Sequence, residues 1–381
     1  MALERMVPEL GEIPRFEPEK LELSDWRDGL LIRTPSWLGD AVMTLPALAV
    51  LRQIVPEPCG LFVTCPRSIA PLFRTLPGIV NAAVELADPH AFPTREEWKT
   101  VRWLNAGVCL LLNNSFRDAL WLKSCRIPKL YGTGARFRSF LMERTFAFPP
   151  RRDHELNKPH QAAKYLAMAM ALGAPDWDGI MPEFTIPEEP ETWPDEVRTA
   201  LQSEKLLALA PGAAYGAAKR WDEERFREVA AWWIRERGGK VALLCSGKET
   251  QAARAAIEGL TPESCFDLGG KTSLETLMLI LKKSSACVAN DSGIMHLAAA
   301  LGTPGAAPFG STDPAATSPL SRRWRILFDK QPCAPCFKRV CPRGDRACMK
   351  AVAAGDVIAA LDQLLSAPAE PDRLEREMKN T

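Results

Sequence analysis

The chain has 381 residues, which is enough for two domains with separate hydrophobic cores. A formal net charge of +1 argues against a nucleic-acid-binding protein, because such proteins usually carry a basic excess. No apolar run approaches the roughly 18 residues that a membrane-spanning helix needs. The N-terminal residues mix charges and prolines and lack the apolar core of an export signal. We therefore expect a soluble, cytoplasmic protein that begins with a poorly structured extension, residues 1–28.

The first half of the chain alternates apolar runs with helical patterns. Continuous apolar runs flanked by helices are typical of buried parallel strands. We predict a first Rossmann-like domain over residues 29–185. Its expected elements are strands at 29–35, 59–66 and 107–114 and a helix at 41–54, despite Pro46.

A proline-rich, acidic stretch at 182–197 has the composition of a linker, and the same pattern then restarts. We predict a second Rossmann-like domain over 186–365 and a polar tail over 366–381. Two such domains place a cleft between the carboxyl ends of their sheets, where these folds bind ligands. The expected elements are strands at 205–212, 240–247, 265–270 and 285–290 and helices at 223–237, 249–259, 273–283 and 292–301.

A dense polar turn follows the last of these predicted strands. Asn290, Asp291 and Ser292 are residue types that cap helix N-termini, and an alanine-rich helical pattern follows them. The outward N–H groups of such a turn suit an anion, and Gly293 allows the anion to approach the backbone. His296 follows at helical spacing and can share the same face. Capping alone explains many turns of this kind, so the concentration of polar groups is what favours a ligand.

Three common ligand-binding motifs are absent. The segment GTGARF lacks the last glycine of the dinucleotide fingerprint, and GGKTS lacks the first glycine of a phosphate loop, where Cys265 stands. Asn290 and Ile294 replace the glycines of a nucleophile elbow around Ser292. The sequence therefore argues against nicotinamide enzymes, P-loop NTPases and α/β-hydrolases.

Two further polar clusters follow predicted strands. Gly39 and Asp40 begin the predicted helix of the first domain. Gly212, Lys219 and Arg220 lie in a loop rich in glycine and alanine after the first strand of the second domain. In a two-domain arrangement, Asp40 can face the other clusters across the cleft.

Together these motifs resemble glycosyltransferase family 9, the lipopolysaccharide heptosyltransferases. The resemblance covers roughly residues 29–365, and the segments FGSTDP and CAPCFKRVCPRGDRACM are similar to the heptosyltransferase II subfamily. The matching residues are Arg33-x5-Gly39-Asp40-x5-Pro46, then Pro211-Gly212, Lys219-Arg220-Trp221 and Asp291-Ser292-Gly293-x2-His296.

The resemblance implies an α/β protein of the GT-B fold, with two Rossmann-like domains facing a central cleft. The first domain is expected to bind a lipid-linked core oligosaccharide at the inner leaflet of the inner membrane, with peripheral membrane contact. The second is expected to bind ADP-L-glycero-β-D-manno-heptose. The implied reaction is inverting transfer of heptose onto the first heptose of the lipopolysaccharide core, by a monomer that requires no cofactor or metal.

Inverting transfer needs one carboxylate on the acceptor side to take the hydroxyl proton, and Asp40 is our candidate. Its simpler role is to cap the following helix. Lys219, the N–H groups of Ser292 and Gly293 and the dipole of their helix are the candidates for balancing charge on the leaving diphosphate. An exposed basic pair is the simpler interpretation of Lys219 and Arg220.

The remaining candidates bind donor or acceptor. Asp291 is expected to orient the donor sugar or its loop, and His296 the phosphates or the Asp291 carboxylate. Glu249 can accept hydrogen bonds from ribose hydroxyls, although an acidic residue that opens a helix needs no such role. The candidates for acceptor binding are Gly39 and three arginines, each of which can equally be a solvated side chain: Arg117, Arg136 and Arg138.

Four of the eleven cysteines, Cys333, Cys336, Cys341 and Cys348, fall within sixteen residues. Their spacing permits a small structural zinc site, although it matches no standard site closely, and a reduced, packed loop is the alternative. Asp345 stands where the family usually has histidine, which argues against transferring a metal role to this segment.

Other functions stay open at this point. A heptosyltransferase I, or an epimerase acting on a sugar nucleotide, would use a similar donor site. Outside enzymes, the alternative is a nucleotide-sensing or zinc-carrying interaction protein that uses the cysteine segment.

Overall fold

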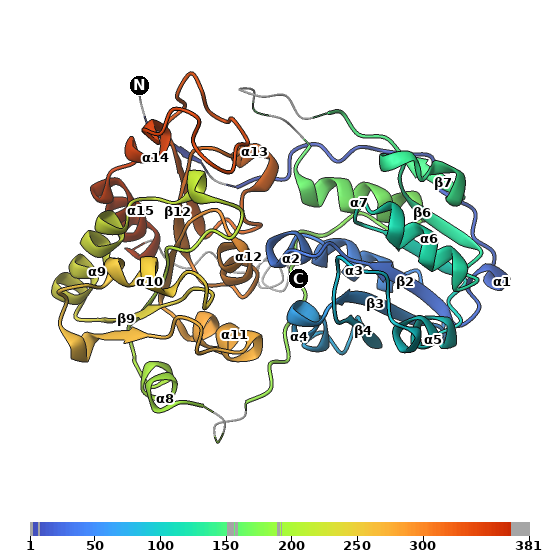
Figure 1. Cartoon of the computed structure of the whole chain (residues 1–381), viewed down its shortest axis with the longest axis horizontal. Helices are drawn as coiled ribbons and strands as arrows, with labels where there is room; N and C mark the ends of the chain where they lie inside the picture. The colour runs from blue at the N-terminus through green and yellow to red at the C-terminus, as the bar shows by residue number, and fades with distance from the viewer. Residues whose placement is uncertain are drawn as a thin grey trace, which may run out of the picture.

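The computed structural model describes residues 3–366 apart from 7, 151–155, 157, 158, 189, 190 and 192. It contains two α/β domains side by side, each built on its own sheet (Figure 1). The predicted polar tail lies, apart from Ser366, outside the described residues. Within the described part of the chain, no helix is long and apolar enough to cross a membrane.

The sheet of the first domain has six parallel strands in the order β4-β3-β2-β5-β6-β7. Because the central strands β2 and β5 are apolar on both faces, helices must cover both sides. The strands are β2 (Gly29–Arg33), β3 (Gly60–Pro66), β4 (Ala82–Leu86), β5 (Val108–Leu111), β6 (Lys129–Thr133) and β7 (Arg144–Phe146). The helices are α2 (Leu38–Val42), α3 (Leu45–Arg52), α4 (Ala70–Arg74), α5 (Arg95–Trp103), α6 (Phe116–Ser124) and α7 (Gln161–Ala171).

The sheet of the second domain has seven strands in the order β1-β13-β12-β11-β8-β9-β10, all parallel except β1. The strands are β1 (Glu4–Met6), β8 (Leu206–Ala210), β9 (Lys240–Leu243), β10 (Cys265–Asp267), β11 (Ala286–Ala289), β12 (Gly305–Phe309) and β13 (Trp324–Phe328). The helices are α8 (Asp195–Leu201), α9 (Glu223–Arg237), α10 (Thr250–Ala253), α11 (Leu274–Lys283), α12 (Gly293–Ala300), α13 (Pro314–Thr317), α14 (Ala347–Lys350) and α15 (Ala354–Ser366).

Two predicted helices are interrupted. The helix predicted over 41–54 is wrong as a single element, because α2 ends at Val42 and α3 begins at Leu45. Pro46 lies in the first turn of α3, where its missing N–H costs nothing, whereas inside a continuous helix it would remove a hydrogen bond. The helix predicted at 249–259 is the short α10 followed by a 3₁₀ turn, Arg254–Ala256.

The expectation of a poorly structured N-terminal extension is also wrong for its described residues. Strand β1 pairs antiparallel with β13, so Glu4–Met6 belong to the sheet of the second domain. Further along, Arg144 of β7 donates to the backbone oxygen of Glu17 and forms an ion pair of 2.7 Å with Glu19. A short helix, α1 (Leu23–Trp26), then leads into β2.

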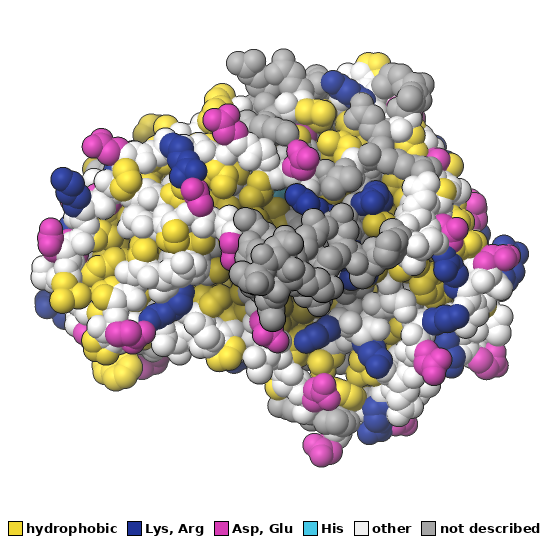
Figure 2. Space-filling view, turned by 180° about the vertical axis from the view of Figure 1, so that it is seen from behind, with side chains coloured by type: hydrophobic (Ala, Val, Ile, Leu, Met, Phe, Trp, Pro, Cys, Tyr) yellow, Lys and Arg dark blue, Asp and Glu magenta, His cyan; other side chains and the backbone are white. Residues whose placement is uncertain are grey.

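The two domains meet where loops leave the carboxyl ends of both sheets, with α2 and α12 in contact at the centre of Figure 1. A second contact joins His160, which caps α7, to the backbone oxygen of Ser318 at 2.9 Å. Figure 2 shows the reverse side of the molecule, where positive and negative side chains are interspersed over both domains. Among the described side chains visible in this view, no large surface of one charge gathers.

Candidate active site

The site begins where the N-termini of α2 and α12 touch. A Cβ atom on Gly39 would lie 2.8 Å from Cδ2 of His296, and one on Gly293 would lie 2.9 Å from Cβ of Leu38. Any larger side chain at either glycine would push the two backbones apart. Asp40, the next residue of α2, is half-buried in the first turn. The structure therefore brings the predicted acceptor-side carboxylate, Asp40, beside residues 290–293, the polar turn predicted to bind the donor, which we call the donor turn.

Asp291 is the centre of the donor turn. Its Oδ2 accepts hydrogen bonds of 2.6 Å from Nζ of Lys219 and 2.6 Å from Oγ1 of Thr312. Burial acts to raise the pKa of this carboxyl, but the charge and hydrogen bond of Lys219, together with His296 and Thr312, outweigh burial and lower it. Asp291 is therefore a buried carboxylate that stays ionised at neutral pH.

His296 is neutral at the same pH. Burial lowers the pKa of this imidazole to about 4, against the opposing attraction of Asp291. With only 4% of its surface exposed, the residue packs against Gly39 of the other domain and interacts electrostatically with Asp291. Whether His296 orients the phosphates or the Asp291 carboxylate stays a prediction.

Lys219 is not the exposed basic residue of the simpler interpretation. Its ammonium lies 4.9 Å from the ring centre of Tyr215, in addition to its ion pair with Asp291. The surrounding loop is fixed by Asn290, whose side chain accepts from the Trp221 N–H at 2.9 Å and donates to the Pro211 oxygen at 2.6 Å. Residues at the ends of β8 and β11 therefore hold one another in place.

Glu249 stabilises the same loop. Its Oε1 accepts from the N–H of Ala213 at 2.7 Å and from Arg220 at 3.4 Å, and its Oε2 accepts from Ser246 at 2.7 Å. A Cβ on Gly212 would lie 2.8 Å from that carboxylate, so a side chain there would displace the Glu249 carboxylate from its present position. Both oxygens of Glu249 thus bond within the protein, and ribose binding by this residue stays a prediction.

Unpaired polar atoms mark both sides of the site. Among the described residues, seven buried side-chain polar atoms lack a hydrogen-bond partner. Three of them are around the donor turn: Oγ of Ser292, Oγ of Ser311 and Nε of Arg220. Two more, Nη2 of Arg33 and Oγ1 of Thr64, lie at the carboxyl ends of β2 and β3. Because buried polar groups are normally paired, this concentration favours a polar ligand here.

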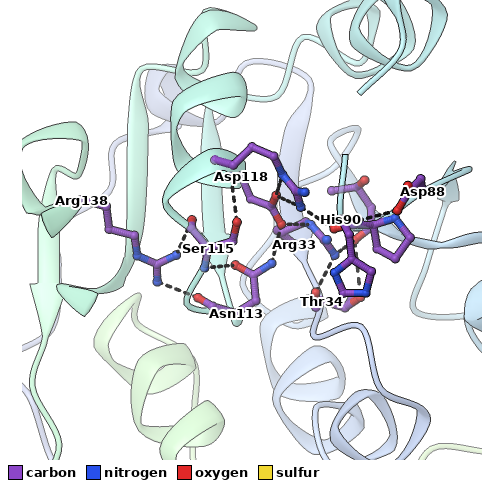
Figure 3. A network of polar contacts seen from close by, with 11 residues as sticks. Arg33, Thr34, Asp88, His90, Asn113, Ser115, Asp118 and Arg138 are labelled. Atoms are coloured by element: carbon purple, nitrogen blue, oxygen red, sulfur yellow. Dashed lines mark hydrogen bonds and ion pairs between the residues drawn. The ribbon is translucent and has the colours of Figure 1, made fainter. Parts of the chain in front are cut away.

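A buried ion pair organises the first-domain side of the site (Figure 3). Nε of Arg33, at the end of β2, donates to Oδ2 of Asp118 on α6 at 2.7 Å, and both side chains are fully buried. Nη1 of Arg33 donates to the oxygen of Thr34 at 2.6 Å, at the start of the loop that leads to Asp40. Arg117 pairs with the other oxygen of Asp118 and donates to the backbone oxygen of Pro89. The pair therefore links three loops at one edge of the sheet.

The three predicted acceptor arginines have different environments. Arg138 is fully buried, and its guanidinium donates to the oxygens of Thr133 at 2.8 Å, Asn113 at 2.6 Å and Ser115 at 3.1 Å. Direct contact of Arg138 with an acceptor is therefore not supported, because its donors already bond to the backbone. Arg117 is mostly buried against Asp118, whereas Arg136 is exposed.

The four cysteines of the 333–348 segment are free thiols that line one pocket of about 190 Å³. No group of three or more histidine, cysteine or acidic side chains in the described residues is arranged to hold a metal ion, so the zinc hypothesis gains no support. The segment packs on the Lys219 loop: Ala218 donates to the oxygen of Arg339 at 3.0 Å, and Arg346 donates to that of Arg220 at 3.0 Å. The cysteine segment therefore stabilises the loop that carries Lys219 and Arg220.

Sequence reasoning missed Thr312, Asn290 as a loop clamp, and Asp118. The signal for Thr312 was its place after a strand, but β12 contains Gly305 and Pro308 and lacks an obvious strand pattern. Asp118 follows the Ser115 cap of α6 and has an ordinary helix-capping environment in sequence. Only the fold shows that its partner is Arg33, 85 positions earlier.

The family model for glycosyltransferase family 9 (heptosyltransferase) matches residues 95–346. Lipooligosaccharide heptosyltransferase 2 of Haemophilus influenzae is 30% identical over 312 residues, covering 78% of this chain and 88% of that protein. Lipopolysaccharide heptosyltransferase 2 of Escherichia coli is 29% identical over 311 residues, covering 78% and 87%.

Solved structures agree with this assignment. The E. coli ADP-heptose lipopolysaccharide heptosyltransferase II superposes with a TM-score of 0.71 at 25% identity, covering 91% of this chain and 99% of that one. A family 9 glycosyltransferase of Veillonella parvula superposes with a TM-score of 0.74 at 20% identity and the same coverage, which shows the shared GT-B fold. The chain therefore belongs to glycosyltransferase family 9, the heptosyltransferases.

Proposed function

We propose that this glycosyltransferase moves L-glycero-D-manno-heptose from ADP-heptose onto the first heptose of the lipopolysaccharide inner core, with inversion. The names of the relatives at about 30% identity, heptosyltransferase 2, support this acceptor. The contact between Gly39 and His296 carries the proposal, because it sets the candidate base directly beside the candidate donor turn. Family membership favours transfer over the epimerase alternative.

In this proposal Asp40 accepts the proton of the attacking hydroxyl. Its place in the first turn of α2 favours the ionised carboxylate, because the N–H groups of a helix start carry partial positive charge. The bond from the anomeric carbon to the ADP oxygen breaks as the acceptor oxygen attacks from the opposite face. The proton moves to Asp40, and the electron pair leaves with the diphosphate.

The leaving diphosphate is stabilised by fixed donors in the second domain. The N–H groups at the start of α12 are aligned, and the unpaired hydroxyl of Ser292 lies at the same end. Lys219 is held in position by Asp291, which keeps one ammonium available without rearrangement. Because these groups balance negative charge, the proposal assigns no step to a metal ion.

The acceptor is proposed to be lipid-linked and to meet the enzyme at the cytoplasmic face of the inner membrane, with the enzyme acting as a monomer. The alternative acceptor is the Kdo residue that a heptosyltransferase I type of enzyme would use. Exposed Arg136 is the best placed of the predicted acceptor arginines to contact acidic sugars or phosphates.

The test is transfer from ADP-heptose to two defined lipids, one ending in Kdo and one ending in the first heptose. We expect turnover only with the second lipid, and the anomeric configuration of the product to be inverted. Turnover with the Kdo lipid alone would reassign the acceptor, and hydrolysis or epimerisation without transfer would contradict the proposal.

A further inference from the structure

A run of exposed apolar side chains crosses the first domain along the segments that follow β4, β5 and β6. We define the apolar surface as five residues. They are Phe92 (64% exposed), Phe116 (36%), Leu120 (40%), Phe137 (90%) and Phe140 (76%). Large apolar side chains exposed singly are common on proteins, but a contiguous group indicates an interaction site.

The five residues are contiguous. Phe92 and Leu120 line the same pocket of about 370 Å³ between α5 and α6. Leu120 and Phe116 are four residues apart on α6 and share one helix face. The rings of Phe116 and Phe140 lie 6.2 Å apart, and Phe137 precedes Phe140 in the same short loop.

The loop that carries Phe137 is held in an unfavourable conformation. Arg136 and Phe137 have φ angles of 54° and 58°, which side chains other than glycine rarely adopt. Buried Arg138 fixes this loop through three backbone acceptors, two in the segment that follows β5 and one at the end of β6. The loop is thus anchored at Arg138, while the adjacent Phe137 lies exposed to solvent.

The apolar surface is bordered by three positively charged side chains. Arg95 lies at the pocket, Lys123 on α6 and Arg136 next to Phe137, and all three are exposed. Most acidic groups nearby in sequence already have partners: Asp118 pairs with Arg33 and Arg117, Glu96 with Lys99, Glu97 with the N–H groups of Ala87 and Thr94, and Asp88 with the N–H of His90. Glu143, three residues after Phe140, adds one exposed acidic side chain to the three cations. Aromatic rings bordered by available cations suit an anionic lipid surface.

We propose that the apolar surface docks the enzyme onto an anionic phospholipid bilayer, with Phe137 and Phe140 inserted among the headgroups. The surface follows the carboxyl ends of β5 and β6, at the same edge of the sheet as the loop that leads from β2 to Asp40. Docking there places the candidate base beside the membrane. The benefit of this docking for catalysis rests on the proposed function, whereas the lipid contact itself is argued from the residues of the apolar surface.

The test uses the full chain and flotation with vesicles of phosphatidylethanolamine and phosphatidylglycerol. The variant Phe137→Ser with Phe140→Ser should bind at least tenfold less lipid, because two rings no longer leave water. The matched control is Leu23→Ser with Val340→Ser, two exposed apolar residues outside the surface, which should bind like the wild type. Unchanged binding of the first variant, or no binding of the wild type, would overturn the proposal.

Charge and catalysis provide two further measurements. The variant Arg95→Glu with Lys123→Glu should reduce binding to the anionic vesicles, and wild-type binding should fall with added salt and on phosphatidylcholine alone. The serine variant should transfer heptose normally to a deacylated, water-soluble core acceptor and poorly to an acceptor in vesicles. An equal loss with both acceptors would instead assign the rings to the acceptor site and contradict docking. If no acceptor is glycosylated at all, the proposed function fails, and flotation still decides the lipid contact.

Discussion

Gly39 of the first domain and His296 of the second are packed so closely that a Cβ atom on the glycine would lie 2.8 Å from the imidazole. The ring is buried, with 4% of the residue exposed, so it has little room to move away from an added methyl group. This contact makes the relative position of the domains depend on the absence of a single methyl group.

Replacing Gly39 by alanine tests that dependence. We expect the α2–α12 contact to open, at a cost of about 1–3 kcal/mol in the free energy of unfolding and with slower transfer. The control is Gly78→Ala, where a Cβ meets no atom within 4 Å. Equal activity and thermal stability of the two variants would show that the domains adjust to the methyl group freely.

Asp40→Asn keeps the shape of the side chain and removes the proposed proton acceptor. Turnover should fall by roughly a hundredfold to ten-thousandfold, the usual contribution of a positioned general base. Donor affinity, measured by calorimetry, should stay near the wild-type value because the donor groups lie in the second domain. If donor binding is lost as well, Asp40 shapes the donor site; if turnover is retained, its role is helix capping.

Lys219→Ala removes both the proposed phosphate contact and the partner of Asp291. Loss of a charge-assisted contact, about 1.5–3 kcal/mol, should weaken ADP-heptose binding and slow transfer by roughly tenfold to a hundredfold. Asp291 would then be a buried carboxylate without its cation, so thermal stability should fall and its pKa should rise. Lys282→Ala, at an exposed position on α11, is the control. Normal donor affinity with reduced stability would limit Lys219 to supporting Asp291.

If protein groups balance the charge of the diphosphate, as proposed, then a metal chelator should have little effect on transfer. Transfer should survive EDTA with only a modest change in rate, because in our proposal Lys219 and the start of α12 supply the positive charge. Initial rates with EDTA and with added Mg²⁺ provide the comparison. An absolute requirement for Mg²⁺ would contradict this and direct attention to Asp291 and Asp313 as ligands.

Two buried histidines at the domain contact predict acid sensitivity. Burial lowers the pKa of His160 and of His296 to about 4, below the usual value of 6.5. Between these values the unfolded chain binds more protons than the folded one, so stability is complete above pH 6.5 and is lost as pH falls towards 4. Each histidine should contribute on the order of 3 kcal/mol across that window. Thermal unfolding between pH 7 and pH 4 measures the slope, and His160→Gln or His296→Gln should reduce it.

The sequence predicted the fold where local patterns determine structure. Strands β2, β3, β5, β8 and β11 are mainly apolar runs, and the structure confirms them within the predicted ranges. Strand β12 was missed because its glycine and proline oppose strand propensity, and burial between β11 and β13 overrides that tendency. Strand β1 has three residues and forms only because β13 offers an edge.

The candidate site likewise contains residues that the sequence could identify and residues that only the fold reveals. Asp291, Ser292, Gly293 and His296 are local to one turn, and the structure brings them to the domain contact beside Asp40. The roles of Asp118 and Arg138 depend on partners in other loops. An isolated arginine in a sequence does not reveal whether its guanidinium will face solvent or the backbone.

The pairing of β1 with β13 gives the chain two crossings between its domains instead of one. The first crossing lies between β1 and β2 and the second between α7 and α8. A single connection would allow the domains to swing and twist about one point, whereas two connections restrict their relative motion towards opening about the line that joins them. The short β1 strand also covers the outer edge of β13, so its removal would expose unpaired backbone groups to other chains. The three residues of β1 thus both restrict the relative motion of the domains and protect the edge of the sheet that carries the donor turn.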